Sequence, residues 1–213
     1  MRAALPLLLI VAAAPLAGCG GAHDSATRNE EQAAAAEQRA PDPEKVMAER
    51  WAQIFADPKA AVAAANDFGY KVPGYLPAGK DFEAKGAVTL PEKPKAITVD
   101  SGFTASGAAA DKLDTLVFTF DVRHKGKVDR ESAEAYRYPV RIVLGFLGRF
   151  QVGPGDTILG ALRRRESASA TLHGVPVKVD AQPIAGGDAK DRHITVTFTR
   201  IGASAPANQT QGK

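Results

Sequence analysis

Two segments early in the chain carry apolar residues at helical spacing. The apolar positions of the first are Met47, Trp51, Ile54 and Phe55, and those of the second are Ala61, Ala64, Ala65 and Phe68. An aspartate-proline pair precedes each segment, at Asp42-Pro43 and Asp57-Pro58. Aspartate is favoured at the N-cap and proline in the first helical turn. We therefore expect two short helices that pack together as a hairpin, the second of them ending at Gly69.

Further along, apolar and polar residues alternate with a period of two, which is typical of half-buried strands. The clearest alternating segments are 116–123, 175–179 and 194–199, and 168–172 is expected to pair with 175–179 across a His173-Gly174 turn. Weaker strands are expected at 87–90 and 95–104. The strands have one apolar face and one threonine-rich face. This pattern predicts an antiparallel sheet that is covered on one side.

The segment 138–150 has apolar residues on every face and fits either a helix or a strand. Its β-branched residues and Gly145 favour a strand. After a turn at 153–155, Asp156 is expected to cap a short helix that continues to Arg165. The pattern as a whole predicts an α+β fold in which two N-terminal helices pack on a curved antiparallel sheet of five or six strands. The alternative is a β-sandwich to which the two helices are appended.

Composition narrows the class of protein. The 213 residues are 45% hydrophobic and 24% charged, which is ordinary for a folded domain. Apolar stretches shorter than about 18 residues argue against a polytopic membrane protein. The single cysteine excludes an intramolecular disulfide framework and a cysteine-based zinc cluster. We expect one folded domain over residues 42–201, followed by a disordered tail at 202–213.

The N-terminus has the features of an export signal. Arg2 supplies a positive charge, a short apolar stretch follows, and small residues then lead to the only cysteine. The sequence Leu16-Ala17-Gly18-Cys19 resembles the lipobox of bacterial lipoproteins, a resemblance that covers this segment alone. It implies cleavage between Gly18 and Cys19, a diacylglycerol on the Cys19 thiol and a fatty acyl group, such as palmitate, on the new amino terminus. The alternative is an ordinary secretory signal with a chance cysteine.

The resemblance also implies a subcellular location. Residues 1–18 would be a signal peptide, and residues 19–41 would be the lipidated cysteine followed by a flexible tether. Gly20 stands where an aspartate would resemble the signal for retention in the inner membrane. We therefore expect a lipid anchor in the outer membrane, with the domain facing the periplasm. Two or three acyl chains hold a protein on a bilayer effectively permanently.

Positive charge is concentrated between residues 120 and 166, which hold ten Lys/Arg against six Asp/Glu. The expected anion-binding patch consists of Arg123, Lys125, Lys127, Arg163, Arg164 and Arg165. Because arginine binds oxyanions bidentately, an anionic envelope component would be a suitable partner. The alternative is a solvated charged face. Nucleic acid is not expected as a partner, because few aromatic side chains are present to stack on bases.

No catalytic motif is found in the sequence, which lacks G-x-S-x-G, S-x-x-K, H-E-x-x-H and a phosphate-binding glycine loop. A metal site would require His124, His173 and His193 to converge with a carboxylate such as Asp121 or Asp191, and no spacing demands this. We predict no metal and no cofactor. The chain is expected to be a non-enzymatic binding or structural lipoprotein. The alternatives are a module that inhibits a hydrolase or toxin, and an envelope hydrolase with an unrecognised carboxylate pair.

Overall fold

The computed structural model of the chain describes residues 42–91 and 96–203. The predicted signal peptide, the lipid-attachment residue Cys19 and the tether lie outside the described residues, as does most of the predicted tail. Within the described part of the chain, no helix is long and apolar enough to cross a membrane.

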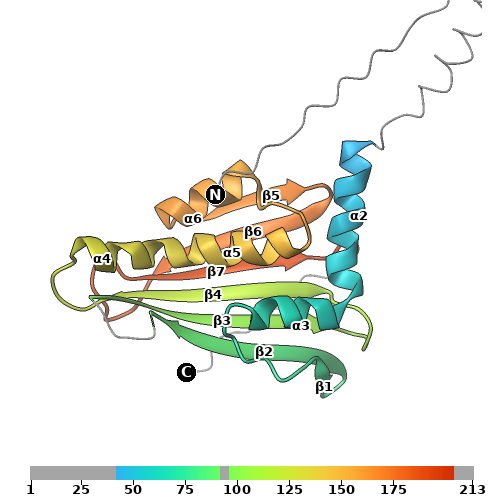
Figure 1. Cartoon of the computed structure of the whole chain (residues 1–213), viewed down its shortest axis with the longest axis horizontal. Coiled ribbons are helices and arrows are strands. Elements are labelled where there is room, and N and C mark those ends of the chain that lie inside the picture. Colours follow the sequence, from blue (N-terminus) through green and yellow to red (C-terminus); the bar gives the residue numbers. More distant parts are fainter. Residues whose placement is uncertain (1–41, 92–95, 204–213) are drawn as a thin grey trace, which may run out of the picture. The chain divides into compact units, whose positions relative to one another are not determined.

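A seven-stranded antiparallel sheet forms the centre of the fold, with the strand order β1-β2-β3-β4-β7-β6-β5 (Figure 1). The strands are β1 Leu76–Ala78, β2 Asp81–Leu90, β3 Ile97–Gly107, β4 Thr115–His124, β5 Ala168–Leu172, β6 Val175–Pro183 and β7 Arg192–Thr199. The three clearest predicted strands are confirmed as β4, β6 and β7, and the expected partner at 168–172 is confirmed as β5. The two weaker ones overlap the longer strands β2 and β3. The short β1 accounts for the strand beyond the predicted number.

The two predicted N-terminal helices are confirmed as α2 Pro43–Ala56 and α3 Pro58–Asn66. Asp42 and Asp57 cap them by accepting hydrogen bonds from backbone N–H groups, at 3.0 Å and 2.9 Å. Figure 1 shows that α3 runs crosswise to α2 and not back along it, so the expected hairpin does not form. Only Asp57 separates the two helices. Reversal of a chain between helices takes two or more residues.

The segment 138–150, for which a strand was favoured, is instead the helix α5, Tyr138–Arg149. Its buried side chains recur at helical spacing, whereas Leu144, which would share a strand face with Ile142 and Phe146, is exposed. Gly145 has a packing role. A Cβ built on it would lie 2.5 Å from Cζ of Phe68. Glycine therefore allows the chain after α3 to approach α5 closely.

The described helices also include three further elements: α4 Arg130–Ala133, the 3₁₀ helix η1 Glu134–Arg137, and α6 Gly155–Arg164. The expected capping role of Asp156 is wrong. Asp156 lies in the first turn of α6, and the N-cap residue, Pro154, makes no side-chain cap bond. Arg165 ends the helix in the left-handed conformation, with φ 57°.

The helices pack on one face of the sheet, and Figure 1 shows α3, α5 and α6 lying across it. The core between the two layers contains an aromatic cluster of Trp51, Phe103, Phe118, Phe146 and Phe198. The opposite face carries threonines and charged side chains. The fold class is therefore α+β, with helices packed on a sheet. The cover is larger than the two predicted helices, because α5 and α6 supply much of the apolar layer.

Candidate functional site

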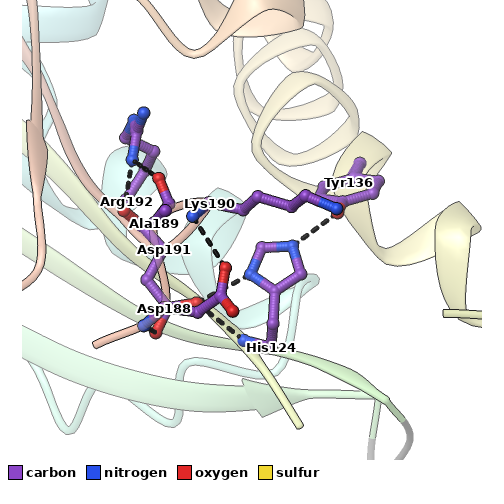
Figure 2. A network of polar contacts seen from close by, with 7 residues as sticks. All are labelled: His124, Tyr136, Asp188, Ala189, Lys190, Asp191 and Arg192. Carbon is purple, nitrogen blue, oxygen red and sulfur yellow. Dashed lines mark hydrogen bonds and ion pairs between the residues drawn. The ribbon is translucent and has the colours of Figure 1, made fainter. Parts of the chain in front are cut away.

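A network of polar side chains surrounds His124, the last residue of β4 (Figure 2). The Nδ1 atom of His124 lies 2.7 Å from Oδ1 of Asp191, and its Nε2 atom lies 2.5 Å from the hydroxyl of Tyr136. An ionised carboxylate can only accept hydrogen bonds, so we assign the proton to Nδ1. In the neutral tautomer Nε2 then accepts from the Tyr136 hydroxyl. We call these three residues the His124 network.

The carboxylate of Asp191 has its hydrogen bonds satisfied although its side chain is only 5% exposed. It accepts from the backbone N–H of His124 at 2.8 Å and from that of Asp188 at 3.0 Å, besides the imidazole. Burial would by itself raise the pKa of Asp191. The hydrogen bonds from His124 and Asp188 outweigh burial and hold the pKa below its usual value. Asp191 is therefore a buried anion at neutral pH.

The local sequence explains how Asp191 reaches His124. The turn before β7 is closed by a bond from Asp191 N–H to the carbonyl of Asp188, at 2.9 Å. Gly187 makes this turn feasible, since a Cβ on that residue would lie 2.6 Å from Oδ2 of Asp191. Tyr136 comes from η1. The His124 network thus ties together the end of β4, the turn before β7 and η1.

The three histidines expected to converge for a metal site each have a different carboxylate partner. His124 bonds Asp191, as described above. His173, at the turn between β5 and β6, lies 2.7 Å from Oε2 of Glu44 on α2. His193 lies 2.5 Å from Oδ1 of Asp121 on the face of the sheet opposite the helices.

A different set of three residues has ligand atoms close enough together to hold a metal ion. The ligand atoms of His124, Asp188 and Asp191 lie within 4.8 Å of one another. Most of their donors and acceptors already have hydrogen-bond partners, however, and only Oδ2 of Asp188 has none among the described residues. His124 Nδ1 and Asp191 bond each other, and Oδ1 of Asp188 accepts from the backbone N–H of Lys190 at 2.9 Å. The arrangement is better explained as a structural clamp than as a metal centre.

An Asp-His-Tyr order also resembles the arrangement of an orienting acid, a base and a nucleophile. Burial argues against that chemistry. Both His124 and Asp191 are almost fully covered, and the hydroxyl of Tyr136 faces the imidazole. The guanidinium of Arg165 lies 4.2 Å from the centre of the Tyr136 ring and covers one of its faces. The geometry of the network therefore favours a role in positioning Arg165 over a role in attacking a substrate.

The predicted anion-binding residues come from two segments, one at the end of β4 and one at the end of α6. Arg165 contacts Tyr136, and Tyr136 bonds His124, which directly precedes Lys125. The structure therefore connects the two segments through the His124 network. Figure 1 shows the end of β4 and α4 at the same end of the sheet.

The charges of this patch differ in how far they are neutralised. Arg164 pairs with Glu166 at 2.8 Å, and Arg123 lies 3.5 Å from Asp121. The three remaining exposed cations make no ion pair with any residue that the structure describes; they are Lys125, Lys127 and Arg163. The patch keeps a positive charge that is available to a partner.

A second His-Asp pair lies on the open face of the sheet. His193 and Asp121 border a shallow hollow of about 350 Å³, which is also lined by Gly102. Asp100 stands directly opposite Asp121 in the register of β3 and β4. Asp100 accepts a hydrogen bond from Thr89 at 2.7 Å. The hollow therefore offers two carboxylates, but both already have hydrogen-bond partners.

Sequence reasoning identified His124 and Asp191 as separate residues and missed Tyr136 and Asp188. The available signal was the position of His124 on the apolar face of β4, because a buried imidazole requires polar partners. No pattern points to Tyr136, which lies in a single turn of 3₁₀ helix. No family model matches the chain, and neither a curated protein nor a solved structure matches it. Its function must be inferred from its own residues and geometry.

Proposed function

We propose that the chain is a bacterial lipoprotein of the cell envelope, anchored through Cys19 and facing the periplasm from the outer membrane. Its domain is a non-enzymatic binding domain that contacts an anionic envelope component. The contact surface is the basic patch of Arg123, Lys125, Lys127, Arg163, Arg164 and Arg165. The observation that carries the binding role is the chain of contacts from Arg165 through Tyr136 to His124. The motif Leu16-Ala17-Gly18-Cys19 supports the anchor.

The His124 network makes the patch suitable for binding because it fixes the elements that bear the charges. Two segments some forty residues apart in sequence are connected through Tyr136 and His124. A surface that is ordered before binding loses less conformational entropy when the partner arrives. Arginine then supplies planar donor pairs that match phosphate and carboxylate oxygens. Lipid A phosphates, acidic polysaccharide and peptidoglycan carboxylates all have this chemistry.

The anchor is tested by growing cells with an alkyne-bearing palmitate and detecting the label on the protein. We expect label on the native chain and none on Cys19→Ser, which should also leave the membrane fraction. An unlabelled native chain that fractionates like Cys19→Ser would contradict the anchor. That result would leave the binding test unaffected.

The patch is tested by co-sedimentation with purified peptidoglycan and with lipopolysaccharide vesicles. The triple variant Lys125→Gln, Lys127→Gln and Arg163→Gln removes the three exposed cations that pair with no described residue, and we expect binding to fall at least about tenfold. The charge-matched control Lys45→Gln, Lys59→Gln and Lys71→Gln alters exposed lysines on or near the N-terminal helices. Equal losses in the two variants, or binding that is insensitive to salt, would contradict the proposed surface.

In-cell crosslinking distinguishes the proposal from its alternatives. We expect an envelope glycan, a lipid or an envelope protein with an acidic surface to be recovered with the native chain. Recovery of a muramidase or protease, together with inhibition of that enzyme by the purified protein, would instead support an inhibitory module. Turnover of envelope glycan that is lost in Asp121→Asn would support a hydrolase.

A further inference from the structure

An apolar groove lies at the other end of the sheet from the His124 network. β4 begins beside the groove and ends at His124, so its ten residues separate the two sites by roughly 30 Å. The groove encloses about 310 Å³. Its uncharged lining consists of Ala48, Ala52, Phe55, Ala56, Val175 and Ile201. The alanines come from one side of α2, while Val175 starts β6 and Ile201 follows β7.

The walls of this groove are fixed to one another by polar contacts. The backbone N–H of Leu113 donates to the carbonyl of Phe55 at 2.8 Å, which joins the segment before β4 to the end of α2. The hydrogen bond of 2.7 Å between His173 and Glu44 joins the turn before β6 to the start of α2. Both ends of α2 are therefore attached to segments that border the groove.

Ile201 lies at the edge of the groove with 59% of its surface exposed. Gly174 in the neighbouring turn leaves room for this side chain, because a Cβ built on Gly174 would lie 2.9 Å from Cδ1 of Ile201. Only two other large apolar side chains are comparably exposed in the described part of the chain, Leu76 and Leu144. An apolar ligand in the groove would remove Ile201 from water, which is favourable.

The charged residues of the groove are both cations, Lys112 and Arg200. Arg200 is neutralised by Asp114, to which its Nε donates at 3.0 Å. Lys112 forms no ion pair with any other residue of the described ranges. No acidic side chain lines the groove. The charge of Lys112 acts on nearby Asp114, but Lys112 has no ion-pair partner among the described residues. An apolar channel bordered by such a cation complements a ligand that has an apolar chain and an anionic head.

We propose that this groove binds a fatty acid, with the alkyl chain along the alanines of α2 and the carboxylate at Lys112. A volume of about 310 Å³ lies at the lower end of the range for small-molecule sites. It is sufficient for a single alkyl chain. The site goes beyond the proposed function and does not depend on lipidation of Cys19, so either proposal can fail alone.

The chain contains a built-in reporter. Trp51 is its only tryptophan. Its side chain is buried in the core against Phe198, and it directly precedes Ala52, which lines the groove. A bromine atom quenches tryptophan fluorescence only at short range, so bromododecanoate reports on a chain in the groove. The experiment uses the predicted mature chain, residues 19–213, with Cys19→Ser so that it carries no acyl group of its own. We expect saturable quenching with a dissociation constant below about 100 μM.

Variants locate the site. Ala52→Leu fills the groove at an exposed helical position, and we expect at least about tenfold weaker binding, whereas Ala63→Leu, at an exposed position of α3, should bind like the parent. Lys112→Gln should weaken bromododecanoate about fivefold and leave the uncharged bromododecanol unchanged. Lys59→Gln is its charge-matched control.

Four results would overturn the proposal. The first is the absence of saturable quenching up to about 100 μM, and the second is equal binding by Ala52→Leu and Ala63→Leu. The third is sedimentation showing a dimer that Ala52→Leu abolishes while the fatty acid does not bind, which would assign the groove to self-association. The fourth is a dodecyl phosphate that binds much more tightly than dodecanoate, which would contradict a carboxylate ligand.

Discussion

The two faces of the sheet carry the same pair of residue types in different surroundings. On the covered face, His124 and Asp191 lie 2.7 Å apart, and each side chain is 5% exposed. On the open face, His193 and Asp121 lie 2.5 Å apart, with side chains 40% and 32% exposed. Asp121 and His124 belong to the same strand, three residues apart. The difference between the pairs is therefore one of environment and not of residue type or distance.

This comparison illustrates how burial decides how much a histidine–aspartate pair contributes to stability. Removing one partner of a buried pair leaves an uncompensated charge away from water, which is strongly destabilising. An exposed pair is screened by solvent and salt, and its loss exposes groups that water already solvates. The covered pair is expected to hold the fold together. The open pair remains free to meet a ligand.

The largest expected effect is that of His124→Ala. It removes two hydrogen bonds and leaves the Asp191 carboxylate buried with only backbone partners. We expect the free energy of unfolding to fall by about 3 to 5 kcal/mol, as is typical of a broken buried pair. Urea denaturation at neutral pH measures it. A loss below about 1 kcal/mol would mean that water solvates Asp191 and would remove the contrast between the two faces.

The next effect concerns pH and Asp191. Its pKa is lower in the folded chain than the usual 3.8 of an aspartate, so its contribution to stability is full above the unfolded pKa and is lost as the pH falls through the folded pKa. We expect Asp191→Asn to cost about 2 kcal/mol from pH 7 down to about pH 4, and progressively less at lower pH. Urea denaturation at pH 7, 5 and 3 gives the comparison.

A second carboxyl group makes the control for this prediction necessary. Burial opposes ionisation of Asp114, but hydrogen bonds from Arg200 and from the backbone of Ala108 hold the pKa of Asp114 below its usual value. The native chain therefore loses stability in acid at two sites at least. Only the difference between the native chain and Asp191→Asn isolates Asp191. A difference that grows in acid would contradict the assignment.

A smaller effect is expected for Tyr136→Phe. The substitution removes the hydroxyl that bonds His124 and keeps the ring on which Arg165 lies. We expect a loss of about 1 kcal/mol in the free energy of unfolding. The patch should also bind its anionic partner more weakly if η1 loses its fixed position. Unchanged stability together with unchanged binding would separate the His124 network from the basic patch.

The smallest effect is expected for His193→Ala on the open face. We expect a change of about 0 to 1 kcal/mol, further reduced by salt. Urea denaturation at low and high ionic strength measures it beside His124→Ala. A cost similar to that of His124→Ala would show that burial is not what distinguishes the two pairs.

The sequence by itself determined the elements whose signals are local. The Asp-Pro pairs placed the starts of α2 and α3, because a cap and a first-turn proline act within a few residues. Strict alternation placed β4 and β7, because successive side chains of a strand point to opposite faces. The one-sided sheet followed from these patterns. The lipid-anchor motif is likewise local, and it remains a prediction.

Only the tertiary structure decided what depends on residues far apart in the chain. The segment 138–150 became a helix because its apolar face meets the sheet and its Gly145 meets Phe68. The partners of the histidines were likewise hidden, since Asp191 reaches His124 across 67 residues and Glu44 reaches His173 across 129. Hydrophobic periodicity reports whether a position faces the core. It carries no information on which distant side chain will satisfy a buried polar atom, because that choice is made only when the elements pack.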